Sequence, residues 1–338
     1  MLSTTVAQRT NVWADMKFLE VAQYYLGAAD KVGQQRPMPQ NKGRVAKFRR
    51  WEKLDISGGA SAFALQEGVT PAGQNMTATD YPATIEEYGN FIRTTDVIQA
   101  TYEDPMYKEY NEKLAIQGAE ISELVTFGGI TGGTTQYYGD GGAETSVLTT
   151  TSIMTTTTLN KIRAALELAR AVKLIPPAKA TTQVSTQGLL SSYVAFCHTD
   201  LTTDLYALSG FVKTNAYPSG TEIWPGEIGS FGHIRFVDAS LGLPPIYGAV
   251  GVTANSSAHV NTGGYLDIYQ ILIVGKDAFG VVPLSGMGSV HTYNVPVGNA
   301  TTDDPLAQRG TVGFKFWKTS VILNDNWMAS YYVARGAY

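Results

Sequence analysis

The chain has 338 residues, a formal net charge of −4, and 16% charged against 44% hydrophobic residues. This weak acidity argues against a general nucleic-acid-coating role, and a charged fraction below the usual quarter suits a protein that buries much of its exterior in an assembly. The single cysteine, Cys197, excludes an intramolecular disulfide. The chain contains no run of about 18 apolar residues, so we expect no membrane span. Its first residues lack the basic-then-apolar order of a signal peptide.

The first elements are a helix and a linker. Helical spacing of apolar residues predicts a helix over 10–26, which Gly27 ends. Residues 33–41 contain two prolines, and each proline biases the preceding residue away from helix, so an extended linker is expected there.

A long two-stranded arm follows. We predict an outgoing strand over 43–54, a Gly-, Ala-, Thr- and Ser-rich tip over 55–81, and a returning strand over 83–97. A two-stranded arm has too little core of its own, so it is expected to lie on another copy of the chain. The stretch from Lys42 to Lys53 holds six of the 25 basic residues: Lys42, Arg44, Lys47, Arg49, Arg50 and Lys53.

The strongest helix prediction covers residues 105–127. Asp104-Pro105 supplies a capping side chain and a proline at the first helical position, and apolar residues then recur from Met106 to Val125 at helical spacing. Gly128-Gly129 is expected to end the helix. Acidic residues crowd the helix and its approach: Glu103, Asp104, Glu109, Glu112, Glu120 and Glu123.

The second half alternates short elements, which together with the first half predict an α+β protein with a boundary near residue 150. A second amphipathic helix is expected over 159–174, before Pro176-Pro177. The other expected elements are a buried strand over 193–198, a short helix over 200–208, strands over 234–237, 245–249 and 268–274, and two strands within 310–333 around Asn324-Asp325.

The search for catalytic or ligand-binding chemistry finds no complete motif. Four scattered histidines and one cysteine do not form a metal-ligand pattern. The glycine-rich run 128–135 follows a predicted helix and lacks the closing Gly-Lys-Ser/Thr of a phosphate loop, so a helix stop is the better interpretation. Cys197 ends an apolar strand and is expected to be a core residue. We therefore predict neither enzyme activity nor a cofactor.

The basic run Lys42–Lys53 has three interpretations. Phe48 and Trp51 could stack on nucleic-acid bases between its cations. The run could also be a plain solvated strand. The favoured interpretation is an electrostatic contact in a homo-oligomer, in which these six cations meet the acidic surface of a neighbouring copy at Glu103, Asp104, Glu109 and Glu112.

A set of motifs occurs in order along nearly the whole chain. The motifs are Arg9-Thr-Asn-Val-Trp-Ala14, Pro-x-Pro-x-Asn-Lys-Gly at 37–43, Lys47-Phe-Arg-Arg50, Glu67-Gly-Val-Thr-Pro-Ala-Gly73, Tyr88-Gly89 with Thr95-Asp96-Val97, Glu103-Asp-Pro105, Cys197-His-x-Asp200, Pro225-Gly-Glu-Ile-Gly229, Gly275-Lys-Asp-Ala-x-Gly280, Asp304-Pro-Leu-x-Gln-Arg309 and Ile322-Leu-Asn-Asp-x-Trp327. Together they resemble one family, the N4-type major capsid proteins of tailed bacteriophages, from which this chain departs mainly in 128–158 and 255–262.

The resemblance implies the HK97-like major capsid fold. It divides the chain into an N-terminal arm (1–35), an extended loop (36–98), a peripheral domain (99–150) with the spine helix 105–127, an axial domain (151–284) and a tail (285–338) that returns to the peripheral sheet.

The implied function is self-assembly into hexamers and pentamers of an icosahedral shell around double-stranded DNA. The implied partners are further copies of the chain, a portal and scaffold or decoration proteins, with no sequence-specific DNA contact and no membrane. The implied location is the virion capsid, assembled in the host bacterial cytoplasm. The alternatives are an encapsulin-type cellular shell and, from another class, a soluble enzyme that uses Cys197 or Glu86.

Overall fold

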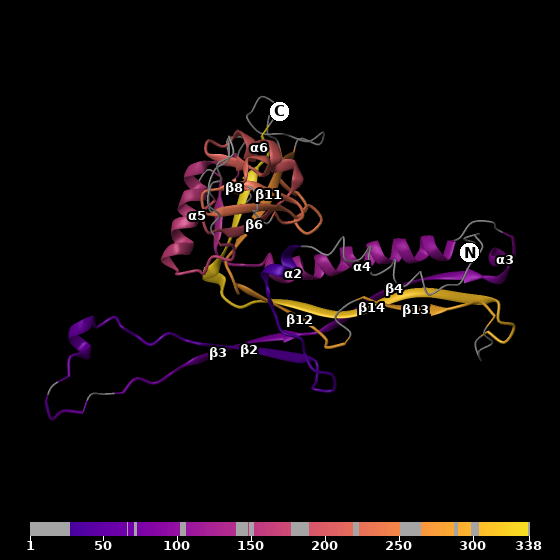
Figure 1. Cartoon of the computed structure of the whole chain (residues 1–338), viewed down its shortest axis with the longest axis horizontal. Coiled ribbons are helices and arrows are strands. Elements are labelled where there is room, and N and C mark those ends of the chain that lie inside the picture. Colours follow the sequence, from indigo (N-terminus) through magenta and orange to yellow (C-terminus); the bar gives the residue numbers. More distant parts are fainter. Residues whose placement is uncertain are drawn as a thin grey trace.

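The structure is a computed structural model that describes residues 28–65, 67–70, 73–101, 106–139, 148, 152–176, 189–218, 223–250, 265–286, 290–298 and 304–336. The predicted helix over 10–26 lies outside these residues. Figure 1 shows a long base, a compact body that rises from it, and a thin arm that projects beyond the base. Within the described residues no helix is both long and apolar enough to cross a membrane.

The base is a five-stranded sheet, the first sheet, built around the long strand β14 (Arg309–Ile322). Strand β4 (Glu86–Thr95) pairs antiparallel along one edge of β14, from Thr95 opposite Arg309 to Glu86 opposite Lys318. Strands β13 (His291–Val295) and β12 (Phe279–Pro283) share the other edge, and β1 (Gln34–Gln35) pairs parallel with β12. A short helix, α3 (Asp96–Thr101), follows β4.

Helix α4 (Met106–Ile130) runs along one face of the first sheet (Figure 1). Leu114 and Ala115 pack there against Phe314 and Phe316. The predicted helix over 105–127 is confirmed, but the glycine pair does not end it. A Cβ at Gly129 would stand 2.7 Å from the carbonyl oxygen of Ser320, so this glycine allows close approach of helix and strand rather than stopping the helix.

The body is an eight-stranded second sheet in the order β5 (Gln136–Tyr138), β15 (Met328–Ala334), β11 (Tyr265–Val274), β6 (Tyr193–Cys197), β9 (Ile234–Asp238), β8 (Glu227–Phe231) and β7 (Phe211–Lys213), with β10 (Ile246–Val250) also paired to β11. The predicted strands over 193–198, 234–237, 245–249 and 268–274 are confirmed. The predicted short helix over 200–208 is a 3-10 turn (Thr199–Leu201) followed by α6 (Thr202–Ala207).

Two apolar layers hold the second sheet. Helix α5 (Thr156–Leu168) covers one face through Leu159, Ile162 and Leu166. The other face packs on the end of α4 and on α2 (Ala28–Val32). All five residues of β6 are buried because both faces of this strand are covered, and its sequence is therefore a continuous apolar run without the usual alternation of apolar and polar residues.

Helix α5 is shorter than the predicted 159–174. Its first turn is capped by the Thr155 side chain, which accepts a hydrogen bond from the Thr158 N–H. It ends at Leu168, and Arg170 then takes a left-handed backbone conformation with φ of 56°. The Trp327 indole N–H donates to the Ala169 carbonyl at 3.1 Å, so a contact from the distant tail satisfies the helix end well before Pro176-Pro177.

The tail differs from the expected return of residues 285–338 to one sheet, because its two strands join different sheets. Strand β14 lies in the first sheet, whereas β15 pairs with β11 and β5 in the second. A 3-10 turn, Asp325–Trp327, connects them. All seven residues of β15 are buried, and a strand buried on both faces fits the middle of the body rather than the base.

The predicted returning strand of the arm, 83–97, is also divided. Residues up to Thr84 form β3 (Ala78–Thr84), which pairs with β2 (Val45–Trp51), whereas β4 belongs to the first sheet. Between them, Ile85 is 2% exposed and its N–H bonds the Arg44 carbonyl at 2.9 Å. The expected unit 36–98 therefore carries one strand of the base, and its outer limits stay a prediction.

Candidate inter-subunit interface

The arm is anchored where its hairpin crosses the first sheet. Phe48 on β2 is 4% exposed and packs with Met38, Ala83, Ile85 and Val282. The ring lies over Gly280 of β12, where a Cβ would come within 2.7 Å of it. This glycine therefore makes room for the one buried aromatic residue of β2, and the root of the arm is a small core shared with the base.

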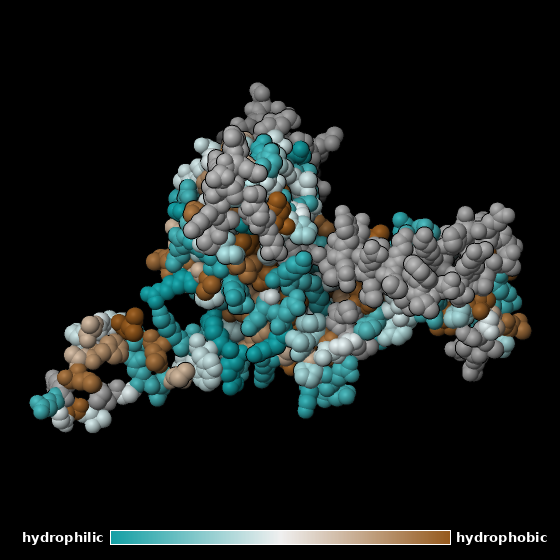
Figure 2. Space-filling view, viewed as in Figure 1, coloured by the Kyte–Doolittle hydropathy of each residue, from teal (hydrophilic) through white to brown (hydrophobic). Residues whose placement is uncertain are grey.

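Beyond this root, the segment between β2 and β3, here called the arm tip, carries apolar side chains in solvent. Figure 2 shows hydrophobic residues gathered at the far end of the arm. Their exposed fractions range from 48% to 76%, although large apolar side chains usually avoid water when they gather in a patch. The members are Leu54, Ile56, Phe63, Leu65, Val69 and Met76.

Two of the predicted arm cations are engaged within the hairpin. Arg49 faces Asp80 across the β2–β3 pair and binds both carboxylate oxygens, with Nε to Oδ1 at 2.7 Å and Nη2 to Oδ2 at 2.9 Å. The hydrogen bond from Arg49 holds the pKa of Asp80 below its ordinary value. Arg50 donates to Glu52 and to the Leu323 carbonyl, which ties the arm to the end of β14.

The other four cations, Lys42, Arg44, Lys47 and Lys53, are exposed. Their side chains form no hydrogen bond or ion pair with the described part of the chain, although the charge of Lys47 helps to lower the pKa of Asp80. Since Arg49 and Arg50 already have partners, these four are the better candidates for a contact with a neighbouring subunit, and that contact stays a prediction.

The predicted acidic surface is described only in part. Glu109 is exposed on the first turns of α4 and Glu112 is half-buried. Glu103 and Asp104 lie outside the described residues. In Figure 1 the start of α4 lies at the opposite end of the base from the arm, so the arm cations do not meet Glu109 and Glu112 of the same subunit.

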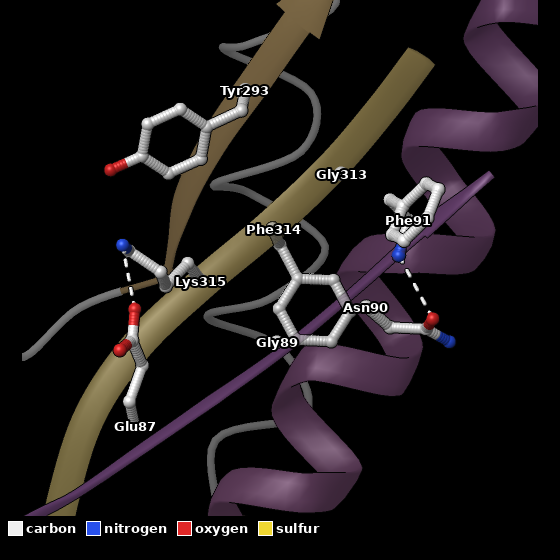
Figure 3. Close-up of a pocket in the computed structure, with 8 residues that line it drawn as sticks. All are labelled: Glu87, Gly89, Asn90, Phe91, Tyr293, Gly313, Phe314 and Lys315. Atoms are coloured by element: carbon white, nitrogen blue, oxygen red, sulfur yellow. Dashed lines mark hydrogen bonds and ion pairs between the residues drawn. The ribbon is translucent and has the colours of Figure 1, made fainter. Parts of the chain in front are cut away.

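A shallow hollow of about 410 Å³ lies on the face of the first sheet opposite α4 (Figure 3). Phe91 on β4 and Tyr293 on β13 stand on either side of Gly313, which pairs with both in the strand register. Phe91 is 53% exposed and Tyr293 48%. Lys315 Nζ bonds Glu87 Oε1 at 2.6 Å beside the Tyr293 ring. The hollow is thus a second exposed apolar surface, and its two exposed aromatic residues, Phe91 and Tyr293, are 202 positions apart in the sequence, which is why the strand patterns did not reveal it.

The two residues considered for catalysis, Cys197 and Glu86, each have contacts that explain them without a reaction. Cys197 is fully buried, as predicted for a core residue, and burial raises the pKa of its thiol well above the ordinary value. Glu86 accepts a hydrogen bond from the Tyr88 hydroxyl. The residues that the structure describes contain no group of three or more His, Cys, Asp or Glu side chains arranged to hold a metal ion.

Sequence comparison and structure comparison give different results. No protein-family model and no curated protein matches the sequence. Among solved structures, the capsid of Ralstonia phage GP4 is similar over 100% of this chain and 94% of that chain, with 12% identity and a TM-score of 0.62. The cyanophage Pam1 capsid asymmetric unit covers 100% and 97%, with 13% identity and a TM-score of 0.58. The acidic stable capsid structure of Helicobacter pylori bacteriophage KHP30 covers 91% and 89%, with 13% identity and a TM-score of 0.53.

These likenesses concern the fold. The chain has the HK97-like capsid fold over its full length, which confirms the predicted α+β fold class.

Proposed function

We propose that this chain is the major capsid protein of a tailed bacteriophage, a structural protein that assembles into the hexamers and pentamers of an icosahedral shell around double-stranded DNA. The finer assignment to the N4-type family is part of the proposal and is supported by the ordered sequence motifs. The HK97-like fold over the whole chain, and the titles of the similar structures, which are phage capsids, support the function.

The observation that carries the proposal is the arm. Its tip exposes six large apolar side chains and has no core behind it, whereas its root is firmly packed on the base. Burying an apolar side chain of this size contributes about 1.5–3 kcal/mol. A fold that holds such a tip away from its own body gains this free energy only on another molecule, and a second copy is the simplest source.

The geometry also favours a repeated contact. The arm tip and the aromatic hollow lie toward opposite ends of the base (Figure 1), so one subunit does not bring them together. A contact between different surfaces of successive copies is heterologous, and heterologous contacts close into rings when the rotation allows it. Many modest contacts of this kind strengthen one another in a closed shell.

The proposed roles of the segments follow the expected domains. The axial domain (151–284) gathers around the hexamer and pentamer axes, and the peripheral domain (99–150) with α4 joins neighbouring capsomers. The exposed arm cations Lys42, Arg44, Lys47 and Lys53 contact an acidic surface of a neighbour that includes Glu109 and Glu112. Arg49 and Arg50 hold the hairpin in the shape that presents these cations.

The proposed partners are further copies of the chain, a portal, and scaffold or decoration proteins, and the proposed location is the virion capsid after assembly in the host cytoplasm. No cofactor or membrane takes part. The shell confines DNA without reading its sequence, which agrees with the net charge of −4.

Electron cryo-microscopy of the purified assembly tests the proposal. We expect closed icosahedral particles with the arm of each subunit lying on a neighbour. Particles from infected cells should contain DNA, whereas an encapsulin-type shell would contain cargo protein. A stable monomer at concentrations that support capsid assembly would refute the proposal.

A further inference from the structure

The segment just before the arm docks in the angle between α4 and the base. Ala29 and Val32 of α2 are each 2% exposed and pack against Phe127 and Ile130 of α4 and Phe279 of β12. Strand β1 continues this segment and pairs with β12. Residues 28–35 thus form a short strap with only a small apolar contact of its own.

A nearly buried ion pair fastens the strap. Lys318 of β14 has a side chain that is only 4% exposed, and its Nζ contacts both carboxylate oxygens of Asp30 at 2.7 Å. The same ammonium donates to the hydroxyl and the carbonyl of Ser122 at 2.8 and 3.1 Å. Thr126 donates its hydroxyl to Asp30 at 2.8 Å. One side chain therefore joins the strap, α4 and β14, and a buried lysine without its carboxylate is strongly unfavourable.

Several carboxyl groups lie around the ion pair, and Lys318 is the one cation named among them. Glu123 is half-buried on α4, and its pKa is raised to about 7, first by burial and then by the charges of Asp30 and Asp238, with a smaller contribution from Glu120. Lys318 opposes this rise. Burial lowers the pKa of Lys318, against the stabilising charge of Asp30. The charged groups around Glu123 thus come from α2, β9, α4 and β14, and one of them is a cation.

We propose that residues 28–35 are a proton-controlled latch, which is closed on α4 and β14 while Glu123 is protonated and is weakened when Glu123 ionises. When the strap leaves, Glu123 loses the neighbouring Asp30 charge, so its ionised form is favoured in the open state. A carboxyl group whose pKa is higher in the closed state stabilises that state fully below its open-state pKa and loses this contribution as the pH rises through about 7.

Hydrogen exchange of the full-length, unassembled subunit tests the latch. The N–H groups of Arg36 and Met38 bond the carbonyls of Val281 and Pro283 and report docking on the base, whereas the Gly33 N–H bonds Ala29 and reports the turn within the strap itself. Their protection factors, corrected for the intrinsic exchange rate at each pH, are compared at pH 5.5 and pH 8. We expect protection to fall on the order of tenfold at pH 8, while peptides from β11 keep theirs.

Three variants isolate the parts. Glu123→Gln keeps the size of the side chain and removes its titration, so it should hold the strap protected at both pH values. Glu120→Gln, one turn away on the same helix, is the matched control and should keep the pH dependence. Asp30→Asn leaves the Lys318 ammonium without its carboxylate and should lower protection at both pH values.

Equal protection at pH 5.5 and 8 in the unchanged protein overturns the switch, and so does a pH dependence that survives Glu123→Gln. Full protection in Asp30→Asn overturns the ion pair as the fastening. The test uses single subunits, so its failure is distinct from failure of the proposed shell, which is read from particles.

Discussion

Removing the apolar character of the arm tip should block assembly without weakening the subunit. Ile56, Leu65 and Met76 are 61%, 76% and 61% exposed, so a triple change to serine removes apolar surface that only a neighbour could cover. Full burial of such a side chain contributes about 1.5–3 kcal/mol, and the exposed share is about two thirds, which gives about 1–2 kcal/mol for each residue. The triple variant should therefore lose about 3–6 kcal/mol for each arm contact, and every 1.4 kcal/mol is tenfold in affinity.

Sedimentation velocity and electron microscopy measure assembly, and thermal unfolding measures the subunit. Because the three side chains are mostly in water in the isolated chain, we expect the midpoint of unfolding to stay nearly unchanged. The matched control changes Ser61, Thr70 and Thr77 of the same tip to alanine and should assemble normally. Normal particles from the serine variant would refute the burial argument, and a large loss of subunit stability would show that the tip is packed on its own chain.

Three further predictions concern the arm. Reversal of Lys42, Arg44 and Lys53 to glutamate should prevent particle formation at low salt while circular dichroism stays unchanged, and normal particles would exclude an electrostatic role. Gly280→Ala should lower the free energy of unfolding by about 1–3 kcal/mol because the new methyl group meets the Phe48 ring, and an unchanged denaturant midpoint would contradict this packing. Limited proteolysis should cleave the arm tip of free subunits and spare it in shells, and equal cleavage in both states would mean that the tip stays uncovered.

The sequence alone would suggest reversing the charges of Arg49 and Arg50, but the structure makes these two residues a poor choice for this test. Reversal of Arg49 would place a glutamate opposite Asp80 on the same hairpin, and like charges in that position are destabilising. Loss of particles would then report a frayed hairpin instead of a lost neighbour contact. Only the pairing seen in the structure separates the two groups of cations.

Local sequence signals identified α4, α5 and several of the strands, although not all of their ends, and they missed short elements such as α3, β5, β7 and β13. The apolar spacing of α4 and the buried run of β6 are properties of short segments, and both were predicted within a few residues. The extent of α5 and of α4 was missed because each end depends on a distant partner, Trp327 in one case and Ser320 in the other.

The sequence by itself determined the α+β class, the presence of a long arm, the site of the basic run and the buried character of Cys197. Hydrophobic periodicity and charge clustering decide these, and both are written along the chain. Tertiary structure alone decided that β3 and β4 join different partners, that β14 and β15 lie in different sheets, which arm cations remain unpaired with the described chain, and that Asp30 meets Lys318 across 288 positions. An alternating strand has two edges and no record of its partner, and the pKa of a carboxyl group depends on neighbours that only folding supplies.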